Sequence, residues 1–271
     1  AYGTGAGIFF LGYVLFEIPS NLFLLRVGPR LWIARIMISW GLISTATVLV
    51  SGEWSFYLIR FLLGIAEAGF FPGVVLYLTY WFPEKSRAHV ISLFATATAV
   101  AGLIGSPLSG LILSMDGWGG WRGWQWLFVL EGLPAVGLGL LVLIWLPDGP
   151  AQANWLSADE RERLIGTLRH EESRRSPQCR HTLREAFVTA RVWLLGLVYL
   201  CMVIGMYGIA LWLPQMLRAI SGADDLTIGF LNALPFLAAS VGMTLIGWHS
   251  DRRQERRWHV VFSLVLAAAG C

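Results

Sequence analysis

Two charged residues, Arg60 and Glu67, lie inside a stretch of the sequence that is otherwise apolar enough to cross a membrane. An ionised side chain at the centre of a bilayer costs at least ~2.5–3.5 kcal/mol, so such residues are rare unless they serve a function. Seven residues correspond to nearly two helical turns, which places both side chains on one face, roughly 10 Å apart along the helix axis. The sequence therefore predicts a cation and a carboxylate that face one space inside a membrane protein.

The two side chains have different chemistry. A guanidinium group is a planar fork that can bind a carboxylate through two parallel hydrogen bonds and that keeps its charge. Burial stabilises the neutral form of a carboxyl group, which can therefore take up and release a proton. Arg60 lies near the end of its span, where an arginine can also extend its charge to the membrane interface. Glu67 lies too deep for that.

The composition is that of an integral membrane protein. Hydrophobic residues make up 56% of the chain and charged residues 14%, whereas soluble domains are ~45–50% apolar and ~25% charged. No apolar segment alternates with the period of two that a barrel strand requires. We predict an all-α protein that crosses the membrane at 2–25, 31–51, 54–82, 89–114, 124–147, 193–217 and 226–250, with a further span that begins at about residue 258.

Positive charges are distributed unevenly among the loops. One alternating set carries sixteen, namely Arg26, Arg30, Lys85, Arg87, the eight arginines from Arg161 to Arg191, and Arg252, Arg253, Arg256 and Arg257. The opposite set carries only Arg122 and Arg218. Loops rich in lysine and arginine remain in the cytoplasm, so we assign the first set to the cytoplasmic side.

The same features divide the chain. We expect a first helical bundle at 1–147, a cytoplasmic linker at 148–192 and the start of a second bundle at 193–271. In the linker, Ser157 and Glu160 have the spacing of a capping box, which predicts a short surface helix. Its charges have mixed signs, which is typical of a solvated face rather than a nucleic-acid site. Because the chain begins without methionine and ends in an apolar run, we interpret it as an internal piece of a longer protein.

Several motifs resemble those of a known transporter family. The segments GWHSDRRQERR (247–257) and RFLLG (60–64) resemble motifs of the major facilitator superfamily. The segments GYVLFEIPSN (12–21), WIARIM (32–37), EAGFFPG (67–73) and WQWLFVLEGLP (124–134) are similar to its anion:cation symporter family, in particular to the bacterial tartrate, phthalate and nicotinate transporters. The resemblance covers nearly the whole chain. It implies two six-helix repeats, of which this chain contains about helix 2 to the start of helix 9.

The resemblance also implies roles for individual residues. Arg60 would bind the substrate carboxylate and Glu67 would couple transport to protons, while Asp251 and Arg252 would belong to a gating loop. Tyr13 and Tyr207 are phenols well inside spans, where a hydroxyl needs a partner, and each is a candidate to line the site.

Two more charged residues, Glu17 and Arg35, lie toward the cytoplasmic halves of neighbouring spans. We expect them to have a structural or gating role, through an ion pair or a helix contact. The closely spaced Gly102, Gly105, Pro107 and Gly110 resemble an antiporter motif, but close helix packing explains them as well.

Together, these observations predict a multi-pass secondary transporter of the bacterial inner membrane. It would take up a small organic anion together with protons, by alternating access between two bundles. Exchange or uniport without proton coupling is one alternative, and a receptor that binds the anion without translocating it is another. We expect a monomer in the lipid bilayer. We expect no enzyme activity, cofactor, metal site or nucleic-acid partner, because no metal-ligand cluster, phosphate loop or nucleophile–base pair is evident in the sequence.

Overall fold

The computed structural model describes residues 2–174, 187–253 and 257–270, and within these ranges the regular structure is entirely helical. The α-helices are α1 (Tyr2–Val27), α2 (Pro29–Ala46), α3 (Glu53–Glu67), α4 (Phe70–Trp81), α5 (Glu84–Leu113), α6 (Gly123–Trp145), α7 (Ala158–Arg174), α9 (Ala190–Ser221), α10 (Asp225–Arg253) and α11 (Arg257–Gly270). Three short 3₁₀ turns accompany them: η1 (Thr47–Leu49), η2 (Trp118–Gly120) and η3 (Pro150–Gln152).

Seven helical segments in the described ranges are long and apolar enough to cross a membrane. They are α1, α2 with η1, α3 with α4, α5, α6, α9, and α10 as far as Ser250. These seven segments match the seven complete spans predicted from hydropathy, and the shorter apolar helix α11 begins where the eighth was expected. The predicted all-α membrane architecture is therefore confirmed.

The described residues form two compact units. The first consists of the residues up to Val90 together with Met115–Val188, and the second of Ile91–Ser114 together with the residues from Thr189 onward. Most of α5 thus belongs with α9 and α10, whereas the sequence placed that helix in a bundle that ended at residue 147. The expected bundle boundaries stay a prediction about the whole protein.

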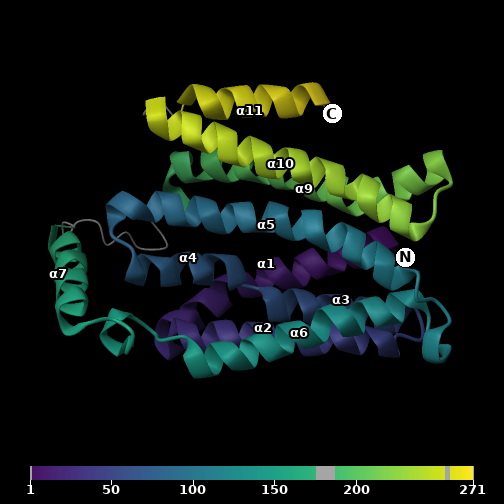
Figure 1. Cartoon of the computed structure of the whole chain (residues 1–271), viewed down its shortest axis with the longest axis horizontal. Coiled ribbons are helices and arrows are strands. Elements are labelled where there is room, and N and C mark those ends of the chain that lie inside the picture. Colours follow the sequence, from purple (N-terminus) through teal and green to yellow (C-terminus); the bar gives the residue numbers. More distant parts are fainter. Residues whose placement is uncertain (1, 175–186, 254–256, 271) are drawn as a thin grey trace. The chain divides into compact units, whose positions relative to one another are not determined.

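Glycines allow two close helix crossings in the first unit. A Cβ atom on Gly12 of α1 would lie 2.6 Å from the carbonyl oxygen of Phe61 in α3. Where α2 crosses α6, a Cβ on Gly41 would lie 2.7 Å from the carbonyl oxygen of Gly132. Figure 1 shows α2 and α6 side by side. Small residues let membrane helices pack backbone to backbone, so these two pairs form the framework of the unit.

The start of α2 is fixed by a residue far away in the sequence. Gly28 has a φ of 95°, which favours glycine, and Pro29 occupies the first helical position. The carboxylate of Asp148 accepts a hydrogen bond of 3.1 Å from the backbone N–H of Arg30. An acidic group at a helix N-terminus is favourable because free N–H groups point toward it. Asp148, which follows α6, therefore joins the ends of α2 and α6.

The predicted linker helix is confirmed as α7. The carboxylate of Glu160 accepts hydrogen bonds from the hydroxyl and the backbone N–H of Ser157, and the N–H of Glu160 donates back to the Ser157 hydroxyl. These bonds hold the pKa of the Glu160 carboxyl below its usual 4.5. Near the other end of α7, Glu171 accepts hydrogen bonds from the backbone N–H of Glu84 at the start of α5.

In the second unit, α5 and α10 cross closely. A Cβ on Gly229 would lie 2.6 Å from the carbonyl oxygen of Ser106, and a Cβ on Gly110 would lie 2.6 Å from that of Asp225. The amide of Asn232 donates a hydrogen bond of 3.0 Å to the hydroxyl of Ser106. Gly110 of α5 and Gly229 of α10 therefore allow these two helices to pack closely, as the packing interpretation of the Gly102–Gly110 segment predicted for Gly110.

Candidate functional site

The span that contains Arg60 and Glu67 is broken in the middle. Glu67 is the last residue of α3, Ala68 leaves the helix with a ψ of 128°, and Gly69 has a φ of 85° before α4 begins at Phe70. The span predicted at 54–82 is confirmed in extent, and the helix is interrupted within it between Glu67 and Phe70. The break falls about halfway along the segment Glu53–Trp81.

Proline and glycine together account for this break. In an unbroken helix the carbonyl of Ala68 would accept a hydrogen bond from residue 72, but Pro72 has no N–H to donate. Gly69 provides the left-handed conformation at which the chain turns. The carbonyl of Ala68 instead accepts a hydrogen bond of 2.6 Å from the hydroxyl of Ser20 in α1. Inside a membrane such a replacement is required, because an unpaired carbonyl there is costly.

The side chain of Ser20 is itself held in place. Its hydroxyl oxygen accepts a hydrogen bond of 2.9 Å from the indole N–H of Trp32 in α2, and Ser20 is buried. A Cβ on Gly69 would lie 2.5 Å from that same hydroxyl oxygen. The break next to Glu67 is thus supported by α1 and α2. The roles of Ser20 and Trp32 could not be predicted from the sequence, because both depend on contacts between different helices.

Arg60 and Glu67 both lie on α3, seven residues apart and before the break, and both are partly buried. The Arg60 guanidinium carbon lies 5.2 Å from the centroid of the Phe56 ring, one turn earlier. Neither side chain forms an ion pair with any residue that the structure describes. A guanidinium and a carboxylate therefore lie on one side of α3, each available to another partner.

Tyr13 lies against this part of α3. A Cβ on Gly64 would approach the carbonyl oxygen of Phe9 and lie 2.9 Å from the backbone nitrogen of Tyr13. Gly64 is between Arg60 and Glu67 in the same helix. The structure therefore brings the backbone of Tyr13 next to the segment that carries both charges.

An ion pair between Glu17 and Arg35 was one of the two contacts expected, beside a helix contact. The two side chains do not form this ion pair. The Arg35 guanidinium carbon lies 4.1 Å from the centroid of the Trp32 ring, in the same helix. Stacking of a guanidinium on an indole is a favourable cation–π contact. On α1, the backbone carbonyl of Glu17 accepts a hydrogen bond of 2.8 Å from the side chain of Asn21. Trp32 thus links Arg35 to Ser20 and the helix break.

The remaining candidates lie in the second unit. Tyr207 is on α9, and its side chain is exposed. Arg252 is on the last turn of α10, with its guanidinium carbon 5.3 Å from the Trp248 ring. Asp251 is also on α10, but its side chain lies outside the described part of the structure. In the described ranges, no three His, Cys, Asp or Glu side chains are placed to hold a metal ion.

Comparison with known proteins identifies the family. The family model for the Major Facilitator Superfamily matches residues 1–271, which is the whole chain. The chain belongs to the major facilitator superfamily. The crystal structure of a bacterial homologue of the human lysosomal transporter Spinster, inward-facing and unoccupied, aligns with a TM-score of 0.70 over 90% of this chain and 53% of that chain, at 20% identity. This likeness shows the fold.

Two named relatives align with nearly the whole of this chain. A protein of Agrobacterium vitis named "Putative tartrate transporter" is 47% identical over 99% of this chain and 62% of its own length. A Pseudomonas putida protein named "Putative metabolite transport protein NicT" is 46% identical over 99% of this chain and 61% of its own length. The chain thus spans about three fifths of the length of these relatives. The family and these relatives are transporters rather than enzymes.

Proposed function

We propose that the protein to which this chain belongs moves a small organic carboxylate across the bacterial inner membrane together with protons, by alternating access. Arg60 would hold the substrate carboxylate and Glu67 would carry the proton. The observation that carries this proposal is the arrangement on α3, where a guanidinium and a carboxylate share one side of the helix and neither pairs with another described residue. The name of the Agrobacterium vitis relative supports a carboxylate as the substrate.

The position of Glu67 supports its role as the proton carrier. It ends α3 at about the middle of the span, next to a backbone break that Ser20 holds in place. A carboxyl group that must be charged in one state of the carrier and neutral in another needs surroundings that tolerate both forms. Discontinuous helices near the middle of the membrane provide such surroundings in many secondary transporters.

Tyr13 belongs to the same proposal, because its backbone contacts α3 between the two charges. Tyr207 would contribute from α9. Asp251 and Arg252 would form part of the cytoplasmic gate. We expect the protein to act as a monomer of two bundles around one central site.

The test that separates the coupling role from a structural role uses Glu67→Gln in the full-length protein in proteoliposomes. Glutamine imitates the protonated carboxyl group permanently, so the variant should exchange substrate across the membrane but should not accumulate it against a gradient. Glu53→Gln, a change of the same kind at the outer end of α3, is the matched control and should do both. Accumulation by the Glu67→Gln variant in response to a proton gradient would remove Glu67 from the coupling mechanism.

Arg60→Lys tests the anchoring role. Lysine keeps the charge but cannot make two parallel bonds to a carboxylate. Loss of one charge-assisted hydrogen bond costs about 1.5–3 kcal/mol, so the half-saturation concentration should rise at least about tenfold. Arg122→Lys, in a loop outside the spans, should leave it unchanged. Equal half-saturation in both variants for every transported acid would assign a structural role to Arg60.

The same preparations distinguish the alternatives. Uptake should be screened with labelled tartrate, phthalate, nicotinate and sugar acids. Exchange that never becomes accumulation, even in the unmodified protein, would favour an exchanger or uniporter. Binding of an acid without any uptake would favour a receptor.

A further inference from the structure

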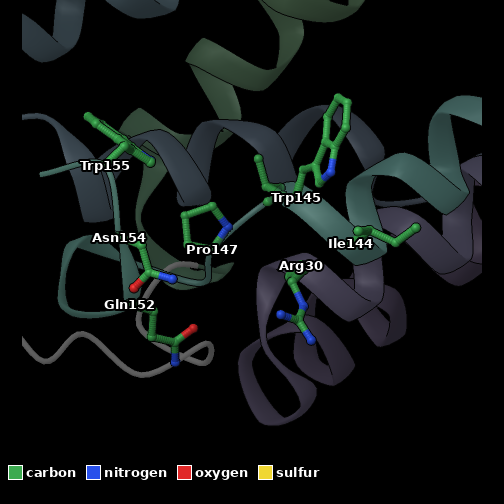
Figure 2. A pocket seen from close by; sticks show the side chains of 8 residues that line it. Arg30, Ile144, Trp145, Pro147, Gln152, Asn154 and Trp155 are labelled. Carbon is green, nitrogen blue, oxygen red and sulfur yellow. The ribbon is translucent and has the colours of Figure 1, made fainter.

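A small cavity lies in the first unit, away from Arg60 and Glu67, where α2 begins and α6 ends. It has a volume of about 230 Å³ and is lined by Arg30, Trp145, Gln152, Asn154, Trp155 and neighbouring residues of the 144–147 segment. Figure 2 shows Arg30 extending from α2, with Ile144 and Trp145 from α6 nearby and the amide side chains of Gln152 and Asn154 across from it. The proposed transport mechanism uses none of these side chains.

The polar wall of the cavity favours an anion. The Nε atom of Arg30 is buried and has no hydrogen-bond partner, and the guanidinium forms no ion pair with any described residue. The nearby carboxylate of Asp148 accepts a hydrogen bond from the backbone N–H of Arg30 and forms no ion pair with its guanidinium. The Gln152 amide oxygen accepts a hydrogen bond of 3.3 Å from the N–H of Asp148, which leaves the NH₂ group of Gln152 as a donor. A buried donor without a partner is costly, so a ligand that accepts its hydrogen bond is stabilised.

The rest of the cavity rim is apolar and faces outward. The side chains of Ile144, Trp145 and Trp155 are 70%, 76% and 70% exposed. Trp155 is held flat against Trp81, with ring centroids 5.6 Å apart and an angle of 10° between the planes. Tryptophans at the ends of spans mark the level of the lipid headgroups. A ligand that contacts both the polar wall and the apolar rim must therefore be amphipathic. Inorganic phosphate would contact only the polar wall.

We propose that this cavity binds the phosphate headgroup of an anionic phospholipid, with Arg30 and Gln152 as donors and the acyl chains along Ile144 and Trp145. The charge distribution assigns this end of α2 to the cytoplasm, where the leaflet carries anionic lipids that attract arginine and lysine. Basic cavities between transmembrane helices on that side are a general form of lipid headgroup site. The lipid would then fasten the ends of α2 and α6 together, as Asp148 already does from within the chain.

The test measures which lipids remain bound to the full-length protein. The protein is reconstituted in vesicles of equal parts phosphatidylcholine and phosphatidylglycerol, extracted in mild detergent, and analysed by native mass spectrometry. Phosphatidylglycerol should be retained in preference to phosphatidylcholine. Arg30→Gln should lower its retention about tenfold, because it removes a charge-assisted hydrogen bond to the phosphate in the cavity. Arg26→Gln is the matched control, because Arg26 is an exposed arginine on the last turn of α1 that does not line the cavity, and it should leave retention unchanged.

A second variant and the contrary outcomes complete the test of lipid binding. If Arg30→Gln does not yield a monodisperse protein, Gln152→Leu removes a donor from the same wall without changing α2, and it should also lower retention. Equal retention of the two lipids, or an equal loss in the Arg30 and Arg26 variants, would overturn the proposal. Displacement of the bound lipid by millimolar inorganic phosphate would overturn it as well, since that result would identify a simple phosphate site.

Discussion

Replacing Gly12 by alanine should push α1 away from α3 and disturb the site that the two helices share. The new Cβ would lie 2.6 Å from the carbonyl oxygen of Phe61, whereas ordinary contact begins at 3.4 Å. The helices must therefore separate by about 0.8 Å, which is the difference between these two distances. Overpacking of this kind costs about 1–3 kcal/mol. Because α1 also carries Tyr13, the separation would move that residue away from the segment between Arg60 and Glu67.

The matched control is Gly7→Ala in the same helix, where a Cβ would meet nothing within 4 Å. Both substitutions increase helix propensity to the same extent, so the difference between them isolates the crossing. The thermal unfolding midpoint and the initial uptake rate of the full-length protein should both fall in the Gly12 variant relative to the Gly7 variant. We expect the rate to fall on the order of tenfold, since displacements near 1 Å at a reacting site have effects of that size or more. Equal midpoints and equal rates would show that the two helices are not in close contact at Gly12.

Three more outcomes can be measured. Ser20→Ala should leave the carbonyl of Ala68 without its hydrogen bond and destabilise the protein by about 1–3 kcal/mol, and an unchanged unfolding midpoint would contradict the bond described here. Protection of the amide hydrogens at the start of α7, measured relative to the intrinsic exchange rate at each pH, should be greatest above the usual pKa of a glutamate, 4.5. It should fall as the pH drops through the lower pKa of Glu160 in the folded protein, because the charged form makes the cap; Ser157→Ala should weaken this pH dependence, because it removes the hydroxyl that donates to the carboxylate. In intact cells, a cysteine introduced at Asp116 should react with an impermeant reagent and one at Glu160 should not, and the opposite pattern would reverse the predicted orientation.

The spans could be predicted from the sequence because lipid leaves the backbone few choices. Every peptide group in the hydrocarbon region must be paired, so a long apolar segment without strand periodicity has to be helical. The cap of α7 was equally predictable, since Ser157 and Glu160 act over three residues. Local patterns thus fixed the elements whose stabilising contacts are themselves local.

The break after Glu67 could not be predicted in the same way. Pro19, Pro107 and Pro134 lie inside helices that continue through them, so a proline in a span does not by itself indicate a break. At Pro72 the difference comes from Gly69 and from the hydroxyl of Ser20, which is 48 positions away from Ala68. Such a contact exists only after α1 and α3 have packed.

Whether Glu17 and Arg35 form an ion pair could not be predicted either, because it depends on how their two helices pack. Their depths in neighbouring spans are compatible with an ion pair, but a tryptophan three residues before Arg35 offers its ring within the same helix. Residue type and depth predicted that Arg35 has a partner, but they did not decide between Glu17 and Trp32. The roles of Arg60 and Glu67 came from their intramembrane positions and from the family resemblance, and the proximity of Tyr13 could be seen only in the folded chain.

The broken span also has an electrostatic consequence. By length, α3 extends about 22 Å and α4 about 18 Å, so neither alone crosses a hydrocarbon core of about 30 Å. Each half-helix has its own macrodipole, with a partial negative charge where α3 ends at Glu67 and a partial positive charge where α4 begins at Phe70. An unbroken helix would place both of its poles in the headgroup regions, where water screens them. Here two poles lie inside the membrane, and unlike the charge of a carboxyl group they persist at every pH.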